Sequence, residues 1–312
     1  MYLPAKMEIV EVAPRDGFQS FGRQISTPDK LAVINRLIGA GLRSIEVTGF
    51  AHPKTIPQFS DAEELCSLLP KRDDVRYRGM APNARGAERA VKAGVDEIVG
   101  LITASAAYLR KNQNMTFEKA IEQGIEAFRI ADAGGRQFTM AMGISFWCAY
   151  EGLIPDDRVM DIVREFRNGG IRRFYLAATV GLESPDHIDR LFRRARRNFP
   201  DAEFGFHVHN LGGRAPALAL AAMGAGADWI EGAICGIGGG IAMPENLSAV
   251  GNYATEDLVT FLADSGVETG LAPAEIIAAA RDVAKILEIT PHSFAGNGAS
   301  RLDIGSMVAA KE

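Results

Sequence analysis

The chain has 312 residues, of which 47% are hydrophobic and 23% charged, and its formal net charge is -5 with a pI near 5.7. This composition is typical of a soluble globular protein, and the acidic balance argues against nucleic acid as the main partner. The three cysteines, Cys66, Cys148 and Cys235, favour a reducing compartment over a disulfide framework. With no signal-peptide pattern and no apolar run of about 18 residues, we expect a cytoplasmic protein without a membrane span.

Short apolar strands alternate with helical segments along the chain. Thr27-Pro28 and Ser184-Pro185 each predict the start of a helix, because a capping side chain precedes a proline. A repeated pattern of helix end, glycine and strand indicates a parallel sheet with helical crossovers, at residues 36–47, 89–100, 164–176 and 221–232. In chain order, we predict strands over residues 7–13, 44–48, 75–80, 96–102, 137–145, 172–178, 203–209 and 229–235.

Eight alternating units predict an α/β fold of the (β/α)₈ TIM-barrel type. We expect one catalytic domain over residues 1–312, with the barrel over about 7–254. Two further helices are predicted over 255–287, followed by a tail that packs loosely or caps the barrel. The alternative is an open doubly wound sheet, which the absence of a G-x-G-x-x-G motif after the first strand disfavours.

Chemistry-bearing residues gather after three of the predicted strands, where such a barrel has its active site. The first strand ends in Arg15-Asp16, which taken alone is more readily interpreted as a solvated surface ion pair. The seventh strand carries His207 and His209, two residues apart and therefore on the same inward face. Two inward histidines, in a chain that has five, favour a metal site over a hydrogen-bonded core position.

A glycine-rich loop begins at residue 236, after the eighth strand, and lacks the Lys-Ser/Thr of a P-loop. We interpret it as a mobile lid, the alternative being a plain flexible connector. Asn252, which follows, offers an oxygen ligand suited to a hard cation. Asp16, His207, His209 and Asn252 together predict a metal site with open positions for a substrate. Magnesium or manganese is the expected ion, and zinc, cobalt and iron are the alternatives.

The chain resembles the 3-hydroxy-3-methylglutaryl-CoA lyase branch of the metal-dependent lyase and Claisen-synthase barrels, over about residues 7–287. The resemblance is carried by VEVAPRDGFQ, SIEVTGFAHPKTIPQFSD, APNARGAERAVKAGVDEIV, CAYEG, HVHN, and GIGGG with VGNYATEDLV. It implies the same four metal ligands as above. It also implies that Arg15 stabilises the enolate oxygen of a thioester and that Glu46 supports the site from the second strand.

The activity that the resemblance implies is a metal-dependent retro-Claisen cleavage of a 3-hydroxyacyl-CoA or related β-hydroxy acid. His207 is the candidate base. The expected partner is a small-molecule substrate, an acyl-CoA, and the helices after the barrel could support a homodimer. Residues expected to contact the substrate are Gln19, Thr179, Gly238, Gly239 and Gly240.

The chain departs from the family pattern around the predicted metal site. The family's loop cysteine, in GLGGC, is Gly240 here, and Cys235 is five residues earlier, within the predicted strand. The family's GDT motif reads Ala177-Ala178-Thr179, so an active-site carboxylate is absent. These changes predict an altered substrate or altered proton handling.

Three other functions remain open from the sequence. A metal-dependent aldolase of 2-oxo acids is favoured by His209-Asn210 and by the missing loop cysteine. A Claisen-condensing synthase is disfavoured, because such enzymes carry a further region for which this chain is too short. A non-catalytic metal-binding relative is disfavoured, because Arg15 and all four predicted ligands remain.

Overall fold

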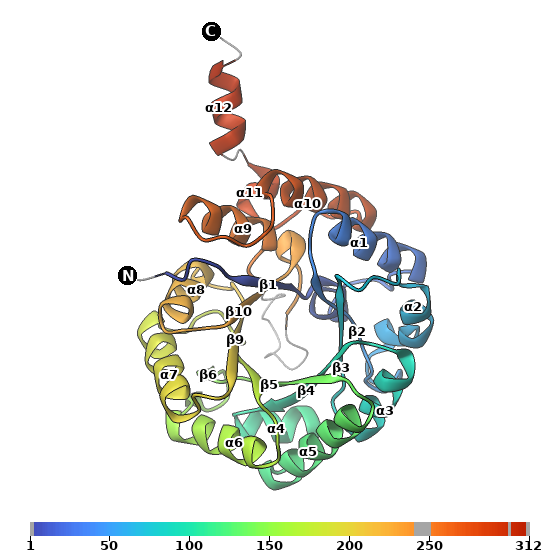
Figure 1. The fold of residues 1–312 in the computed structure, drawn as a ribbon, viewed down its shortest axis with the longest axis vertical. Coiled ribbons are helices and arrows are strands. Elements are labelled where there is room, and N and C mark those ends of the chain that lie inside the picture. The colour runs from blue at the N-terminus through green and yellow to red at the C-terminus, as the bar shows by residue number, and fades with distance from the viewer. Residues whose placement is uncertain (1–2, 240–250, 299–300, 310–312) are drawn as a thin grey trace.

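Eight parallel strands form a closed barrel with helices around it in the computed structural model, which describes residues 3–239, 251–298 and 301–309 (Figure 1). The order around the barrel is β1-β10-β9-β8-β5-β4-β3-β2, so all eight predicted strands are confirmed. They are β1 (Glu8–Glu11), β2 (Ser44–Gly49), β3 (Arg76–Met80), β4 (Glu97–Thr103), β5 (Gln137–Gly143), β8 (Arg173–Ala178), β9 (Glu203–Val208) and β10 (Trp229–Gly232).

The outer helices shield the barrel, and the core lies between the two layers. Phe206 on β9 points outward and packs edge-on against Phe192 of α7, with ring centroids 5.6 Å apart. The helices are α1 (Thr27–Gly39), α2 (Ala62–Leu68), α3 (Ala84–Ala93), α4 (Ala106–Gln113), α5 (Phe117–Ala133), α6 (Asp156–Asn168), α7 (Pro185–Asn198), α8 (Ala215–Gly224), α9 (Thr255–Asp264), α10 (Pro273–Leu287), α11 (Phe294–Asn297) and α12 (Arg301–Ala309). None of the described helices is long and apolar enough to cross a membrane.

Three local features differ from or refine the prediction. The cap of α1 is Ser26, whose hydroxyl accepts a hydrogen bond from the Asp29 backbone, so the helix begins one residue earlier than Thr27-Pro28 suggests. A hairpin of β6 (Trp147–Cys148) and β7 (Gly152–Leu153) follows β5, and its two-residue strands are too short for a periodic pattern to reveal. The predicted tail ends in α12, which points away from the barrel (Figure 1).

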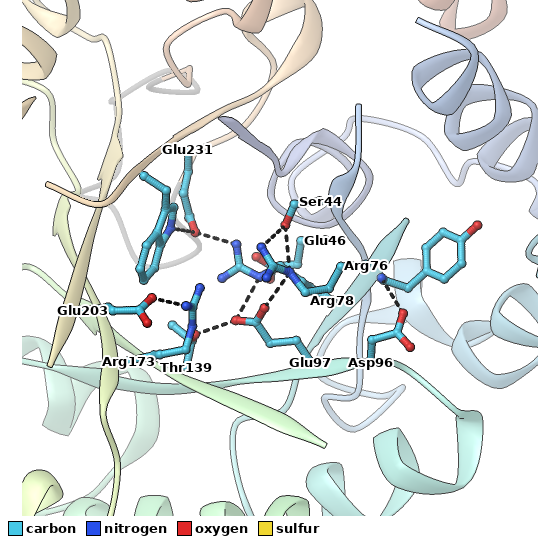
Figure 2. Close-up of polar contacts among 12 residues, drawn as sticks. Ser44, Glu46, Arg76, Arg78, Asp96, Glu97, Thr139, Arg173, Glu203 and Glu231 are labelled. Atoms are coloured by element: carbon cyan, nitrogen blue, oxygen red, sulfur yellow. Dashed lines mark hydrogen bonds and ion pairs between the residues drawn. The ribbon is translucent and has the colours of Figure 1, made fainter. Parts of the chain in front are cut away.

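Charged side chains fill part of the barrel interior, where branched apolar residues are usual in this fold (Figure 2). Arg78 of β3 is fully buried and donates from Nη1 to Glu231 of β10 at 3.0 Å. Its Nε lies 3.5 Å from a carboxylate oxygen of Glu97 on β4. A buried charge is tolerated only when it is paired, so these strands are held together by one network of opposite charges.

Candidate active site

A π-helical turn, η1 (Ala13–Gly17), follows β1 and directs two neighbouring charged side chains into the barrel mouth. Such turns are rare and occur often at functional sites. Arg15 Nε donates to Glu46 Oε1 at 2.5 Å, and Arg15 Nη1 donates to Asp16 Oδ1 at 2.6 Å. All three side chains are buried, so the interpretation of Arg15-Asp16 as a solvated surface pair is wrong.

His207 and His209 direct the same ring nitrogen toward each other. Their Nε2 atoms lie 3.1 Å apart. The Nδ1 atom of His207 is 3.0 Å from Glu231 Oε2, and that of His209 is 2.5 Å from the carbonyl oxygen of Thr179. Acceptors at Nδ1 hold the proton on that nitrogen, which leaves both Nε2 lone pairs free to bind an ion.

Asn252 lies beside the two histidines because residues 251–254 run along the ends of β9 and β10. A β-bridge joins Asn252 to His209. The Asn252 amide nitrogen donates to Asp16 Oδ2 at 2.7 Å and to the Ile237 carbonyl at 2.9 Å. Its Oδ1 atom is buried and has no hydrogen-bond partner, which is a costly state for a carbonyl oxygen unless a ligand satisfies it.

Gly238 packs directly on this pair of side chains. A Cβ atom at this position would lie 2.1 Å from Asn252 Nδ2 and 2.8 Å from Asp16 Oδ2. Its backbone φ of +127° is also one that residues with side chains rarely adopt. Glycine is therefore required at position 238 for two reasons: a Cβ atom would overlap the predicted ligands, and the backbone φ is positive.

These four residues fit a divalent cation. One oxygen or nitrogen atom from each of Asp16, His207 and His209 lies within 4.8 Å of the others. Two ligands about 2.1 Å from one ion, at right angles, are about 3.0 Å apart, close to the separation of the two Nε2 atoms. The unpartnered Asn252 Oδ1 is a fourth atom that such an ion could bind. A mixed set of imidazole, carboxylate and amide oxygen suits magnesium, manganese or zinc and excludes a thiolate site.

Nearby cations lower the pKa of two buried carboxylates of the site, Asp16 and Glu231, whereas burial raises the pKa of Glu46. Burial raises the pKa of Asp16, but Arg15 and the two histidines outweigh it and hold that pKa far below the usual range. For Glu231, burial is likewise outweighed by Arg78 and His207, and the pKa is lowered. Arg78 therefore stabilises the anionic form of the carboxylate that orients His207.

A cavity opens above the site and is lined by Arg15, Asp16, His207 and His209. Gln19 and Thr179, predicted to contact substrate, also line it, and the Thr179 hydroxyl oxygen accepts a hydrogen bond from the Ile144 backbone. Glu46 lies behind Arg15 and does not line the cavity in the described structure. Gly238 and Gly239 are buried at the edge of the site, whereas Gly240 lies outside the described residues.

Cys235 is turned away from the site. Its thiol donates to the Ala280 carbonyl of α10, and burial raises its pKa well above the usual range. It therefore does not replace the loop cysteine of the family pattern. Among the described residues that line the cavity there is no cysteine.

Sequence reasoning missed Glu231, Arg78 and Tyr175. Glu231 sits in WIEG, where alternation along the strand places it inward like Glu46 in SIEV, so its position was available as a signal. Arg78 pairs with residues 153 and 19 positions away, and only the closed barrel brings them together. The ring of Tyr175 stacks on His207 with centroids 5.6 Å apart.

Comparison with known proteins places the chain in one family. Residues 6–283 match the family model described as HMGL-like. The chain is 32% identical to human mitochondrial hydroxymethylglutaryl-CoA lyase, over 91% of this chain and 87% of the relative. The HMG-CoA lyase structure from Bacillus subtilis superposes with a TM-score of 0.89 at 29% identity, covering 94% of this chain and 97% of that one.

A second solved relative carries bound ligands. It is an HMG-CoA lyase from Acinetobacter baumannii in complex with coenzyme A and 3-methylmalate, with a TM-score of 0.88, 30% identity, and coverage of 95% of this chain and 96% of that one. Family model, curated relative and solved structures thus agree over nearly the whole chain. The chain belongs to the HMGL-like family, and these relatives are lyases.

Proposed function

We propose that this protein is a divalent-metal-dependent carbon–carbon lyase that cleaves a 3-hydroxyacyl-CoA. The observation that carries the proposal is the unsatisfied Oδ1 atom of Asn252, whose amide nitrogen contacts Asp16. Asp16, His207 and His209 line the cavity together with Arg15. The names of the relatives support the reaction class, and the Acinetobacter complex supports a coenzyme A thioester as the substrate type.

Asp16, His207, His209 and Asn252 would hold the metal ion. When bound, such an ion supplies Lewis acidity, which lowers the pKa of a coordinated hydroxyl and orients adjacent substrate oxygens. Magnesium or manganese suits the two oxygen donors, and zinc, cobalt and iron accept the same set.

Arg15 would stabilise the enolate oxygen of the departing acetyl thioester. Glu46 and Asp16 accept from two of its nitrogens at 2.5 and 2.6 Å, so its guanidinium is fixed before the substrate arrives. A donor held in place in a water-poor site contributes most where charge develops in the transition state. Glu46 acts through Arg15 and is a positioning residue.

His207 serves as a metal ligand in this proposal. The predicted role as a base would need the same ring nitrogen, Nε2. Its Nδ1 faces Glu231, so Nε2 is the nitrogen available either to bind the ion or to take up the hydroxyl proton. A ligated nitrogen has no free lone pair for a proton. We therefore assign His207 to binding, and its Nδ1–H donates to Glu231.

Contacts to the substrate are proposed for Gln19, Thr179, Gly238 and Gly239. Gln19 and Thr179 line the cavity, and the Thr179 hydroxyl can donate to a substrate oxygen while it accepts from Ile144. Gly238 brings backbone close to the ligand set without adding a side chain, and Gly239 follows it directly.

The test is a turnover screen with purified protein in Mg²⁺ or Mn²⁺, with and without a chelator. Mass spectrometry reads acetyl-CoA and free carbonyl products from 3-hydroxyacyl-CoA thioesters, and pyruvate from 4-hydroxy-2-oxo acids. We expect acetyl-CoA release that the chelator abolishes and that Asp16→Asn lowers at least about 100-fold. Pyruvate release without thioester cleavage would contradict the lyase proposal and indicate an aldolase.

A further inference from the structure

Tyr175 brings a hydroxyl group to the cavity beside the predicted metal site. It lines the cavity from β8, two residues before Ala177, which lies on the same inward face and also lines it. The Tyr175 side chain is buried, and its ring stacks on His207 with the ring planes 28° apart. The phenol and the guanidinium of Arg15 lie within electrostatic reach of each other. The hydroxyl therefore shares this part of the cavity with Arg15 and a predicted ligand.

Two polar atoms in this part of the cavity are free to bind a ligand. Arg15 donates from Nε to Glu46 and from Nη1 to Asp16, whereas its Nη2 makes no hydrogen bond with the described residues. The Tyr175 hydroxyl makes none with them either. Neither atom is among the fully enclosed polar atoms that lack a partner, so both can be reached from the cavity. Both are hydrogen-bond donors, which suits them to an oxygen of a bound molecule.

A pair of fixed donors is what a developing oxyanion needs. Enzymes stabilise such an oxygen with preorganised donors, and tyrosine hydroxyls are among the side chains used. Tyrosine is protonated at neutral pH, and burial raises the pKa of Tyr175 further, so its hydroxyl remains a donor. The stack on His207 holds the ring in place before a substrate arrives.

We propose that the Tyr175 hydroxyl is a second donor to the thioester oxygen that Arg15 binds, and so a catalytic residue. This inference rests on the proposed function. In the cleavage, the bond between carbons 2 and 3 breaks, and its electron pair forms the thioester enolate, whose charge lies on oxygen. Arg15 and Tyr175 donate to that oxygen and keep their protons. The proton that the substrate hydroxyl loses balances the proton that carbon 2 gains.

Glu46 offers the Tyr175 hydroxyl a different acceptor. Its Oε2 atom is buried and has no hydrogen-bond partner, and its carboxylate lies within electrostatic reach of Tyr175. In the described part of the chain, the hydroxyl does not hydrogen-bond to this atom. A hydroxyl that donated to Glu46 would act only through Arg15, whereas a donor to the substrate acts on the enolate itself. The two roles therefore differ in how they respond to a change of Glu46.

The first test compares Tyr175→Phe with the unaltered protein in saturating Mn²⁺. Acetyl-CoA release is measured with the best thioester from the turnover screen, beginning with 3-hydroxy-3-methylglutaryl-CoA. We expect kcat to fall about 100-fold and KM to change by less than about threefold, because the enolate charge is present only in the transition state. Mn²⁺ binding by calorimetry should be unchanged, since phenylalanine keeps the ring on His207. The control is Tyr77→Phe, which removes a hydroxyl that donates to the Pro70 carbonyl and should change kcat less than about twofold.

A kcat for Tyr175→Phe within about threefold of the unaltered protein would overturn the inference and leave the lyase proposal standing. Loss of Mn²⁺ binding would also overturn it, because the hydroxyl would then support the metal site. If the unaltered, metal-loaded protein cleaves no thioester, the lyase proposal itself fails.

The second test repeats Tyr175→Phe in a Glu46→Gln background. A hydroxyl that donates to the substrate should still be worth at least about tenfold in kcat there. If its effect disappears once the Glu46 charge is removed, the hydroxyl acts through Glu46, and the inference is wrong.

Discussion

Replacing Arg78 by methionine should destabilise the fold and weaken the predicted metal site together. The guanidinium contacts Glu231 at 3.0 Å and Glu97 at 3.5 Å, and both carboxylates are fully buried. Removing one partner of a buried pair costs about 3–5 kcal/mol. With an m-value of about 3 kcal/mol/M, the urea midpoint should fall by about 1–2 M.

The pH dependence of this loss follows from the pKa of Glu231. Arg78 and His207 lower it against the effect of burial, so the ionised form contributes stability that is present above the unfolded pKa and lost as pH falls through the folded pKa. Without Arg78, burial raises the pKa of Glu231, which keeps its contacts with His207 and Trp229 but loses its arginine partner. This buried carboxylate is then costly mainly while it is ionised. The destabilisation should therefore be largest near pH 8 and shrink toward pH 5.

Urea unfolding of the unaltered protein and Arg78→Met at pH 5 and pH 8, followed by fluorescence, measures the loss of stability and its pH dependence. The control is Arg164→Met, which removes an exposed pair with Asp161 within α6 and should cost about 0–1 kcal/mol at either pH. A loss below about 1 kcal/mol for Arg78→Met, or a loss that does not depend on pH, would refute the view that Arg78 holds the network together.

The remaining predictions concern residues at the site itself. Gly238→Ala should abolish metal binding by calorimetry, because its Cβ would overlap Asn252, whereas Gly213→Ala, also at positive φ but in open space, should bind normally. Glu46→Gln should lower kcat by about 10²-fold with KM little changed, because Arg15 loses its charged anchor; an altered KM alone would contradict a positioning role. Thr179→Val should raise KM and cost about 1–3 kcal/mol in thermal or urea unfolding, because the Ile144 N–H loses its acceptor.

The barrel could be predicted because each strand has a short sequence pattern of its own, and the same pattern recurs along the chain. Helix end, glycine and apolar strand recur along the chain, and parallel strands buried on both faces read as short apolar runs. The 147–153 hairpin has no such pattern, since strands of two residues carry no period. Ser26 was missed as a cap because Thr27 and Pro28 imitate one.

The site was predictable in part for a similar reason. His207 and His209 share a face by alternation alone, and Asp16 stands at a strand end where chemistry is expected. The orientation of these side chains was not predictable, because it depends on partners far along the chain. Glu231 and Arg78 fix His207 only once β3, β4 and β10 close around one interior.

The most direct test of the central claim is diffraction from crystals grown with Mn²⁺, recorded at the manganese absorption edge. The account predicts one strong anomalous peak within about 2.0–2.3 Å of His207 Nε2, His209 Nε2, an Asp16 carboxylate oxygen and Asn252 Oδ1. A peak elsewhere, or a well-ordered site without manganese at saturating concentration, would contradict it.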